Sequence, residues 1–178
     1  MAGEYYCQAF AASFGLATLC LRYFNVFGPR QDPASPYSAV IPLFITAMLR
    51  GERPTIYGDG KQSRDFTVVE NVVQGNLLAA AAPAENVSGR VFNVATGRSI
   101  TLLDLIDALN EQLGTNIQPH FAPPRTGDVL HSLADTQAAR QQFGYEPKVN
   151  LAEGLRRTVA FYRTWIAKDA PAAGSASH

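Results

Sequence analysis

The sequence is poor in the residues that build metal centres and disulfide frameworks. Its 178 residues include only two cysteines, Cys7 and Cys20, and three histidines, His120, His131 and His178. The histidines lack the spacing of metal ligands, and two cysteines cannot form a disulfide framework. Both cysteines lie in apolar, periodic segments, so we expect buried, reduced thiols and no metal site.

An excess of charge of one sign is also missing. Fifteen lysines and arginines balance fifteen aspartates and glutamates, so no field of one sign is available to gather nucleic acid or anionic lipid. No apolar run reaches the roughly 18 residues of a membrane span. The N-terminus, Met1-Ala2-Gly3-Glu4, lacks the pattern of a signal peptide. We therefore expect a cytoplasmic protein that binds neither nucleic acid nor membrane.

Short motifs typical of phosphate loops, zinc proteases and esterases are absent as well. The sequence contains no G-x-x-x-x-G-K-[ST], no H-E-x-x-H and no G-x-S-x-G. Gly58-Asp59-Gly60 contains a lone G-x-G, but Ser63 stands where the dinucleotide fingerprint needs a third glycine, so a tight turn is expected. An unrelated, hydrolase-type activity stays open as an alternative, because His120 or His131 could act with nearby carboxylates.

What the sequence does contain is the pattern of an α/β protein. Hydrophobic residues make up 47% of the chain, which suffices for one ordinary domain. The almost continuous apolar run over 16–24 predicts a strand buried on both faces of a parallel sheet. Helices are predicted over 1–14, 38–49, 70–82, 102–113, 135–143 and 151–166, and further strands over 55–57, 65–69, 91–95 and 117–121. The order resembles a doubly wound sheet entered in its middle.

Three arginines stand out because they lie in predicted loops rather than on a helix face. Arg30, Arg64 and Arg125 each neighbour glycine, proline or aspartate. The planar guanidinium group suits bidentate binding of phosphate oxygens, and α/β proteins place such groups in loops at strand ends. The alternative is a set of unrelated surface ion pairs with Asp32, Asp65 and Asp128.

Four segments carry a resemblance to a known family. They are Leu21-Arg22-Tyr23-Phe24-Asn25-Val26-Phe27-Gly28-Pro29-Arg30-Gln31-Asp32-Pro33, Ile56-Tyr57-Gly58-Asp59-Gly60-Lys61-Gln62-Ser63-Arg64-Asp65-Phe66, Phe92-Asn93-Val94-Ala95-Thr96-Gly97 and Arg125-Thr126-Gly127-Asp128. In this order they resemble landmarks of the NAD-dependent sugar-nucleotide epimerases and dehydratases of the extended short-chain dehydrogenase family. The resemblance spans about residues 1–165 and is strongest to UDP-hexose and UDP-N-acetylhexosamine 4-epimerases, such as the UDP-glucose and UDP-N-acetylglucosamine enzymes.

The resemblance implies a fold and a division of the chain. The fold would be a truncated Rossmann-type α/β fold, mainly the small C-terminal substrate-binding domain with the last helix and strand of the nucleotide-binding sheet. Residues 1–36 would be the remnant of the Rossmann domain. Residues 37–167 would form the nucleotide-sugar-binding region, and 168–178 a disordered tail.

The resemblance also implies a binding site for UDP or a UDP-sugar. Arg64 and Arg125 would grip the diphosphate, Tyr57 could stack on the uracil ring, and Tyr23 would contact the nicotinamide end of NAD. Asn25 would bond the diphosphate region, and Asp128 would lie near the ribose. The complete predicted substrate site is Asn25, Val40, Ile41, Thr55, Tyr57, Arg64, Arg125 and Asp128.

One departure from the family limits the expected activity. In intact members the helix that begins here carries Tyr-x-x-x-Lys, and this motif and the G-x-x-G-x-x-G loop would precede residue 1. Neither Tyr5 nor Tyr6 is followed by lysine at the fourth position. We therefore expect no catalytic residue, no bound NAD and no epimerase activity from the chain alone, although the family's enzymes oxidise C4 of the sugar with NAD.

A self-associating fragment without a ligand is the second alternative. With sheet partners missing, the helix over 1–14 and the strand over 16–24 would expose apolar surface. In the family this helix also contributes to a homodimer. The resemblance therefore implies a homo-oligomer formed through the N-terminal helix and strand.

Overall fold

The computed structural model describes residues 2–33 and 40–169. Its helices are α1 (Ala2–Phe14), α2 (Val40–Leu49), α3 (Val69–Ala81), α4 (Ala84–Val87), α5 (Leu102–Leu113), α6 (Gln137–Phe143) and α7 (Leu151–Asp169). Its strands are β1 (Leu19–Tyr23), β2 (Val26–Phe27), β3 (Thr55–Tyr57), β4 (Ser63–Arg64), β5 (Thr67–Val68), β6 (Arg90–Val94), β7 (Ile100–Thr101) and β8 (His120–Ala122). The predicted tail lies largely outside the described residues.

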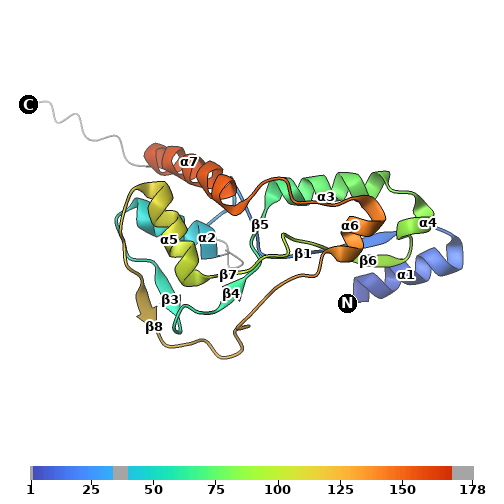
Figure 1. Cartoon of the computed structure of the whole chain (residues 1–178), viewed down its shortest axis with the longest axis horizontal. Helices are drawn as coiled ribbons and strands as arrows, with labels where there is room; N and C mark the ends of the chain where they lie inside the picture. The colour runs from blue at the N-terminus through green and yellow to red at the C-terminus, as the bar shows by residue number, and fades with distance from the viewer. Residues whose placement is uncertain (1, 34–39, 170–178) are drawn as a thin grey trace, which may run out of the picture.

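The strands pair two by two rather than in one wide sheet. Parallel pairs join β1 to β6, β2 to β5 and β3 to β8, and an antiparallel pair joins β4 to β7. Figure 1 shows an elongated molecule in which α2, α5, α7, β3 and β8 form one end, while β1, β6, α1, α3, α4 and α6 form the other. The β4–β7 pair lies between the two ends.

Two separate hydrophobic cores match these two ends. The larger one surrounds Phe27, Ile45, Leu105, Leu155 and Tyr162, and joins α2, α5 and α7 to the short strands β2, β3 and β5. The smaller one surrounds Phe92, Val94, Ala139 and Tyr145, and joins β6 to α3 and α6, with Leu21 of β1 packed against it. The members of the two cores do not follow chain order. The predicted boundary between 36 and 37 lies outside the described residues.

The environment of β1 differs from the prediction. The strand was expected to be buried on both faces, but Leu19 to Leu21 are half-buried, and Arg22 and Tyr23 are exposed. Within the described residues β1 pairs only with β6, so its other edge has no strand partner. One neighbouring strand covers less of its surface than two would.

The two cysteines differ from the prediction for the same reason. Cys7 on α1 and Cys20 on β1 are free thiols, as expected, but both are half-buried rather than buried. No residue of α1 is buried. The Thr18 hydroxyl donates to the Cys7 carbonyl at 2.7 Å, and the Arg22 guanidinium pairs with Glu4. These contacts hold α1 against β1 without enclosing it.

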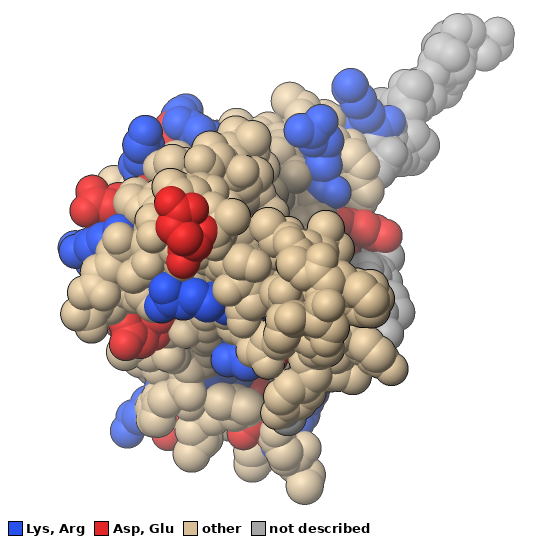
Figure 2. All heavy atoms as spheres, turned by 90° about the vertical axis from the view of Figure 1, so that its right-hand side faces the viewer, with Lys and Arg blue, Asp and Glu red and all other residues tan. Residues whose placement is uncertain are grey.

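The end of the molecule with α1 carries an apolar surface. Five large apolar side chains here are between 47% and 74% exposed, namely those of Tyr5, Tyr6, Phe10, Phe14 and Leu16. Figure 2 faces this end and shows a broad area without charged side chains beside a separate region where they gather. Among the described residues, no helix is long and apolar enough to cross a membrane.

Candidate functional site

Seven of the eight predicted substrate-site residues line a single cavity of about 510 Å³. This volume lies within the range of roughly 300–1,000 Å³ that is typical of small-molecule sites. The cavity is bordered by α2, by β3 and by the segments around β4 and residue 125. The seven residues are Asn25, Val40, Thr55, Tyr57, Arg64, Arg125 and Asp128. Asn25 and Asp128 are more than a hundred positions apart in the sequence, and the seven residues come from separate segments.

Arg64 is held firmly in the wall of this cavity. One terminal nitrogen donates to Asp128 Oδ1 at 2.9 Å, and the other donates to the carbonyls of Ser63 at 2.9 Å and Leu130 at 3.3 Å. The Arg64 side chain is 15% exposed and that of Asp128 is 42% exposed. The guanidinium is therefore oriented before any ligand arrives. Arg64 lies on the two-residue strand β4, not in a loop as predicted.

Arg125 and Tyr57 lie against each other in the wall of the cavity. The Arg125 guanidinium carbon lies 3.7 Å from the centre of the Tyr57 ring, well within the range of a cation–π contact. Arg125 belongs to a stretch exposed to solvent, and Tyr57 is 38% exposed. The backbone N–H of Asp128 donates to the Arg125 carbonyl at 3.3 Å, so both predicted clamp arginines are linked to Asp128.

Asn25 is fixed in an uncommon backbone conformation. Its φ is +34°, a region that asparagine adopts more readily than most other residues. Its side-chain amide donates to the Asp65 carbonyl at 3.1 Å, and its own carbonyl accepts from the Thr67 N–H at 3.3 Å. These bonds attach Asn25 to the segment that carries Arg64.

Three residues of the sequence hypothesis lie outside this cavity. The Ile41 side chain is fully buried in the larger core, so its predicted backbone contact with uracil stays untested. Tyr23 is 49% exposed, and its hydroxyl donates to Asn76 Oδ1 at 3.0 Å. Arg30 is exposed and has a φ of +69°.

One ion pair of the surface ion-pair alternative is present, between Arg64 and Asp128. Arg64 pairs with Asp128 rather than with its neighbour Asp65. Asp65 is fully buried and bonds to Thr96, Gly97 and Ala134 instead.

The cavity also contains charged residues that the sequence analysis missed. Arg53 and Glu52 line it, and Arg53 donates to the carbonyls of Gln118 and Pro119. The same loop criterion that selected Arg64 could have found Arg53, which stands just before Pro54 and β3. Three arginines against two carboxylates give the cavity wall a positive balance, which favours an anionic ligand.

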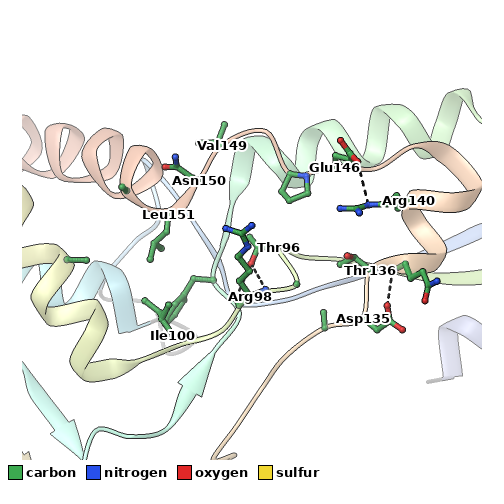
Figure 3. A pocket seen from close by; sticks show the side chains of 17 residues that line it. Thr96, Arg98, Ile100, Asp135, Thr136, Arg140, Glu146, Val149, Asn150 and Leu151 are labelled. Carbon is green, nitrogen blue, oxygen red and sulfur yellow. Dashed lines mark hydrogen bonds and ion pairs between the residues drawn. The ribbon is translucent and has the colours of Figure 1, made fainter.

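Two further cavities flank this site. One of about 760 Å³ shares Tyr57, Gln62, Arg125 and Asp128 with it. The other, of about 860 Å³, holds none of the predicted site residues. Figure 3 shows it between the loop of Thr96 and Arg98, the residues before α6 and the start of α7, with Arg140 paired to Glu146. Because the predicted site residues line the cavity of about 510 Å³ and not this one, we favour the cavity of about 510 Å³ as the site.

The structure also bears on the hydrolase alternative. His131 Nδ1 lies 3.0 Å from Ser63 Oγ, which is the spacing of a nucleophile and its base. No carboxylate among the described residues bonds to His131 to orient it, and His120 lies apart on β8. The third member of a hydrolytic triad is therefore missing from the described part of the chain.

The catalytic spacing of the family occurs once in the sequence, where the sequence analysis overlooked it. Lys61 follows Tyr57 at the fourth position. The family places this pair on a helix, but Tyr57 ends β3 and Lys61 lies in the turn that follows. The described residues also contain no group of three or more His, Cys, Asp or Glu that could hold a metal ion.

The fold and the site are those of an α/β protein with an arginine-lined cavity beside short strands. Comparison with known proteins identifies its family. The model of the NAD dependent epimerase/dehydratase family matches residues 1–95. A curated relative, UDP-glucose 4-epimerase of Mycolicibacterium smegmatis, is 37% identical over 92% of this chain and 51% of its own length. The chain belongs to the NAD-dependent epimerase/dehydratase family.

Solved structures agree with this assignment. UDP-N-acetylglucosamine 4-epimerase from Methanobrevibacter ruminantium, in complex with UDP-N-acetylmuramic acid, is 43% identical with a TM-score of 0.84 over 92% of this chain and 52% of that chain. UDP-glucose 4-epimerase from Thermotoga maritima, with UDP-glucose, is 42% identical with a TM-score of 0.86 over 93% and 52%. The chain spans about half the length of these relatives.

The family's cofactor fits poorly to the residues present. A related UDP-glucose 4-epimerase from Thermus thermophilus was solved in complex with NAD. These 178 residues contain no G-x-x-G-x-x-G loop. The hydroxyl of Tyr23 donates to Asn76, and its contact with NAD stays a prediction. We therefore derive no chemical step through NAD from this chain.

Proposed function

We propose that this chain is the UDP-sugar-binding portion of an NAD-dependent UDP-hexose 4-epimerase. It binds the nucleotide diphosphate and orients the sugar, but it binds no NAD and epimerises nothing alone. The observation that carries the proposal is the meeting of Asn25, Tyr57, Arg64, Arg125 and Asp128 in one cavity. Guanidinium groups on separate segments suit the two phosphates, and an aromatic ring beside them suits a base.

The residues of the proposed binding site contact different parts of the ligand. Thr55 and Val40 border the base, Asn25 bonds the diphosphate region, and Asp128 accepts from the ribose. Ile41 contributes through its backbone. The proposed location is the cytoplasm, with no nucleic-acid or membrane partner.

Calorimetric titration with UDP tests the proposal. Arg64→Ala and Arg125→Ala should each cost about 1.5–3 kcal/mol of binding free energy, the typical loss for a charged hydrogen bond. Arg156→Ala is the control, because Arg156 pairs with Glu153 on the exposed side of α7. Equal losses in all three variants would indicate nonspecific electrostatics, and absence of UDP binding would refute the proposal. A separate titration with NAD should show no binding.

We also propose that the chain forms a homo-oligomer through α1 and β1. The exposed aromatic residues of α1 and the open edge of β1 support this proposal. Contiguous apolar surface of this kind is typical of protein interfaces.

A further inference from the structure

Asp65 is the one buried carboxylate among the described residues. It is fully buried, and its oxygens accept from the Thr96 N–H at 3.0 Å, the Thr96 hydroxyl at 2.5 Å, the Gly97 N–H at 2.9 Å and the Ala134 N–H at 3.5 Å. These donors belong to the loop after β6 and to the segment before α6. The side chain thus ties two distant segments to one point.

The backbone of Asp65 serves the candidate site from the other side. Asp65 directly follows Arg64, and its carbonyl accepts from the Asn25 side chain at 3.1 Å. Arg64 and Asn25 are both predicted to bind the diphosphate. A two-residue strand such as β4 has too few ladder bonds to hold its position by itself, so its anchoring depends on neighbouring contacts.

The residues that bind the Asp65 side chain also border a cavity. Thr96, Gly97 and Ala134 all line the cavity of about 860 Å³, and Figure 3 shows Thr96 and Arg98 bordering it. The loop after β6 leads directly into β7, whose Ile100 pairs with Arg64 of β4, and the bonds to Asp65 are a second connection between the loop and the strand of Arg64.

We propose that Asp65 is a positioning residue that sets Arg64 and Asn25 for the diphosphate of the ligand. The inference rests on the proposed function. It assigns to Asp65 an effect on phosphate binding beyond its contribution to folding. Asp65 itself contacts no ligand, because it is fully buried.

The test compares UDP with uridine, since only UDP carries the phosphates. Asp65→Asn keeps the size of the side chain but turns one acceptor into a donor that faces N–H groups. The ratio of UDP affinity to uridine affinity should fall about tenfold, the loss expected for one weakened charged hydrogen bond. Uridine affinity should stay within about twofold, because the base contacts are unchanged.

Asn71→Asp is the matched control. Asn71 is also buried, its amide bonds Lys148 and Val149, and it lines none of the three cavities. This variant should lower the melting temperature and leave the ratio unchanged. An equal fall of the ratio in both variants, or no fall in Asp65→Asn, would overturn the inference.

Thr96→Val covers the case in which Asp65→Asn does not fold. It removes one hydroxyl donor to Asp65 and keeps the side-chain shape, so the ratio should fall by about twofold to fivefold, and an unchanged ratio would overturn the inference. If the native chain binds no UDP, the proposed function fails and the inference fails with it. If UDP binds with an unaltered ratio in both Asp65→Asn and Thr96→Val, only the inference fails.

Discussion

The guanidinium carbon of Arg125 lies 3.7 Å from the centre of the Tyr57 ring. Arg125, which is predicted to bind a phosphate, therefore lies over the ring that is predicted to stack on the base. For the base to stack on this face of the ring, as the proposed site has it, Arg125 would have to exchange the ring for a phosphate.

Replacing Tyr57 tests this exchange. Tyr57→Ala removes the stacking surface for both partners and should weaken UDP binding by about 0.5–1.5 kcal/mol, the worth of an aromatic pair. Tyr57→Phe keeps the ring and should bind UDP almost as the native chain does. Titration calorimetry measures both. Equal weakening in the two variants would assign the effect to the hydroxyl group and contradict the stacking role.

The apolar surface of α1 leads to a prediction about size in solution. Phe10 and Phe14 lie side by side, with ring centres 5.2 Å apart. Replacing both by glutamate places charges in the proposed interface and should shift the chain toward the monomer, as light scattering over a range of concentrations will show. Gln8→Glu, at an exposed position of the same helix, is the control. A native chain that is monomeric at every concentration would refute the proposed interface.

The sequence predicted elements whose ends are encoded locally. Helix α5 has the predicted bounds, because Thr101 and Asp104 form a reciprocal capping box and Gly114 ends the helix with a φ of +70°. Such signals need only residues close in sequence. The short strands β2, β4 and β7 were not predicted as separate elements, because two residues form a strand only through a partner distant in sequence.

The candidate site also contains features that the sequence predicted and features that it could not predict. The motifs predicted that Arg64, Asn25 and Asp128 belong to one binding site, and all three line the same cavity. The stacking of Arg125 on Tyr57 and the bonds of Asp65 could not be predicted, because they depend on side-chain directions fixed by the fold. Arg53 was missed although its loop position resembles that of Arg64.

Gly154 on α7 occupies a position without room for a side chain. A Cβ there would lie 2.3 Å from a Val68 methyl group and 3.0 Å from Phe27 Cζ. Gly154→Ala should therefore lower the free energy of unfolding by about 1–3 kcal/mol through overpacking, despite the better helix propensity of alanine. Denaturant unfolding measures the change.

Gly3→Ala is the matched control for this substitution. Gly3 lies on α1, and a Cβ there would meet nothing within 4 Å. The same exchange should be neutral or slightly stabilising at this position. A neutral Gly154→Ala variant would contradict the tight packing of α7 on β5.

Tyr145 gives the stability of the chain a dependence on alkaline pH. Burial, and secondarily the Asp65 carboxylate, raise the pKa of Tyr145 from 10.0 to about 12. Its hydroxyl donates to the Ala95 carbonyl at 3.1 Å. Because the folded state holds the proton more tightly than the unfolded state, this contribution to stability is fully present below pH 10 and is lost between about pH 10 and 12.

Tyr145→Phe should therefore change the pH profile as well as the stability. At pH 8 the variant should lose about 1 kcal/mol with the hydrogen bond, and its stability should fall less steeply than that of the native chain as the pH rises from 9 to 11. Urea unfolding at several pH values measures both effects. Tyr6→Phe is the control, since Tyr6 is 68% exposed, and its profile should match the native one. Parallel profiles for the native chain and Tyr145→Phe would show that Tyr145 ionises equally in both states, because a proton bound with the same affinity folded and unfolded cannot change the free energy of unfolding.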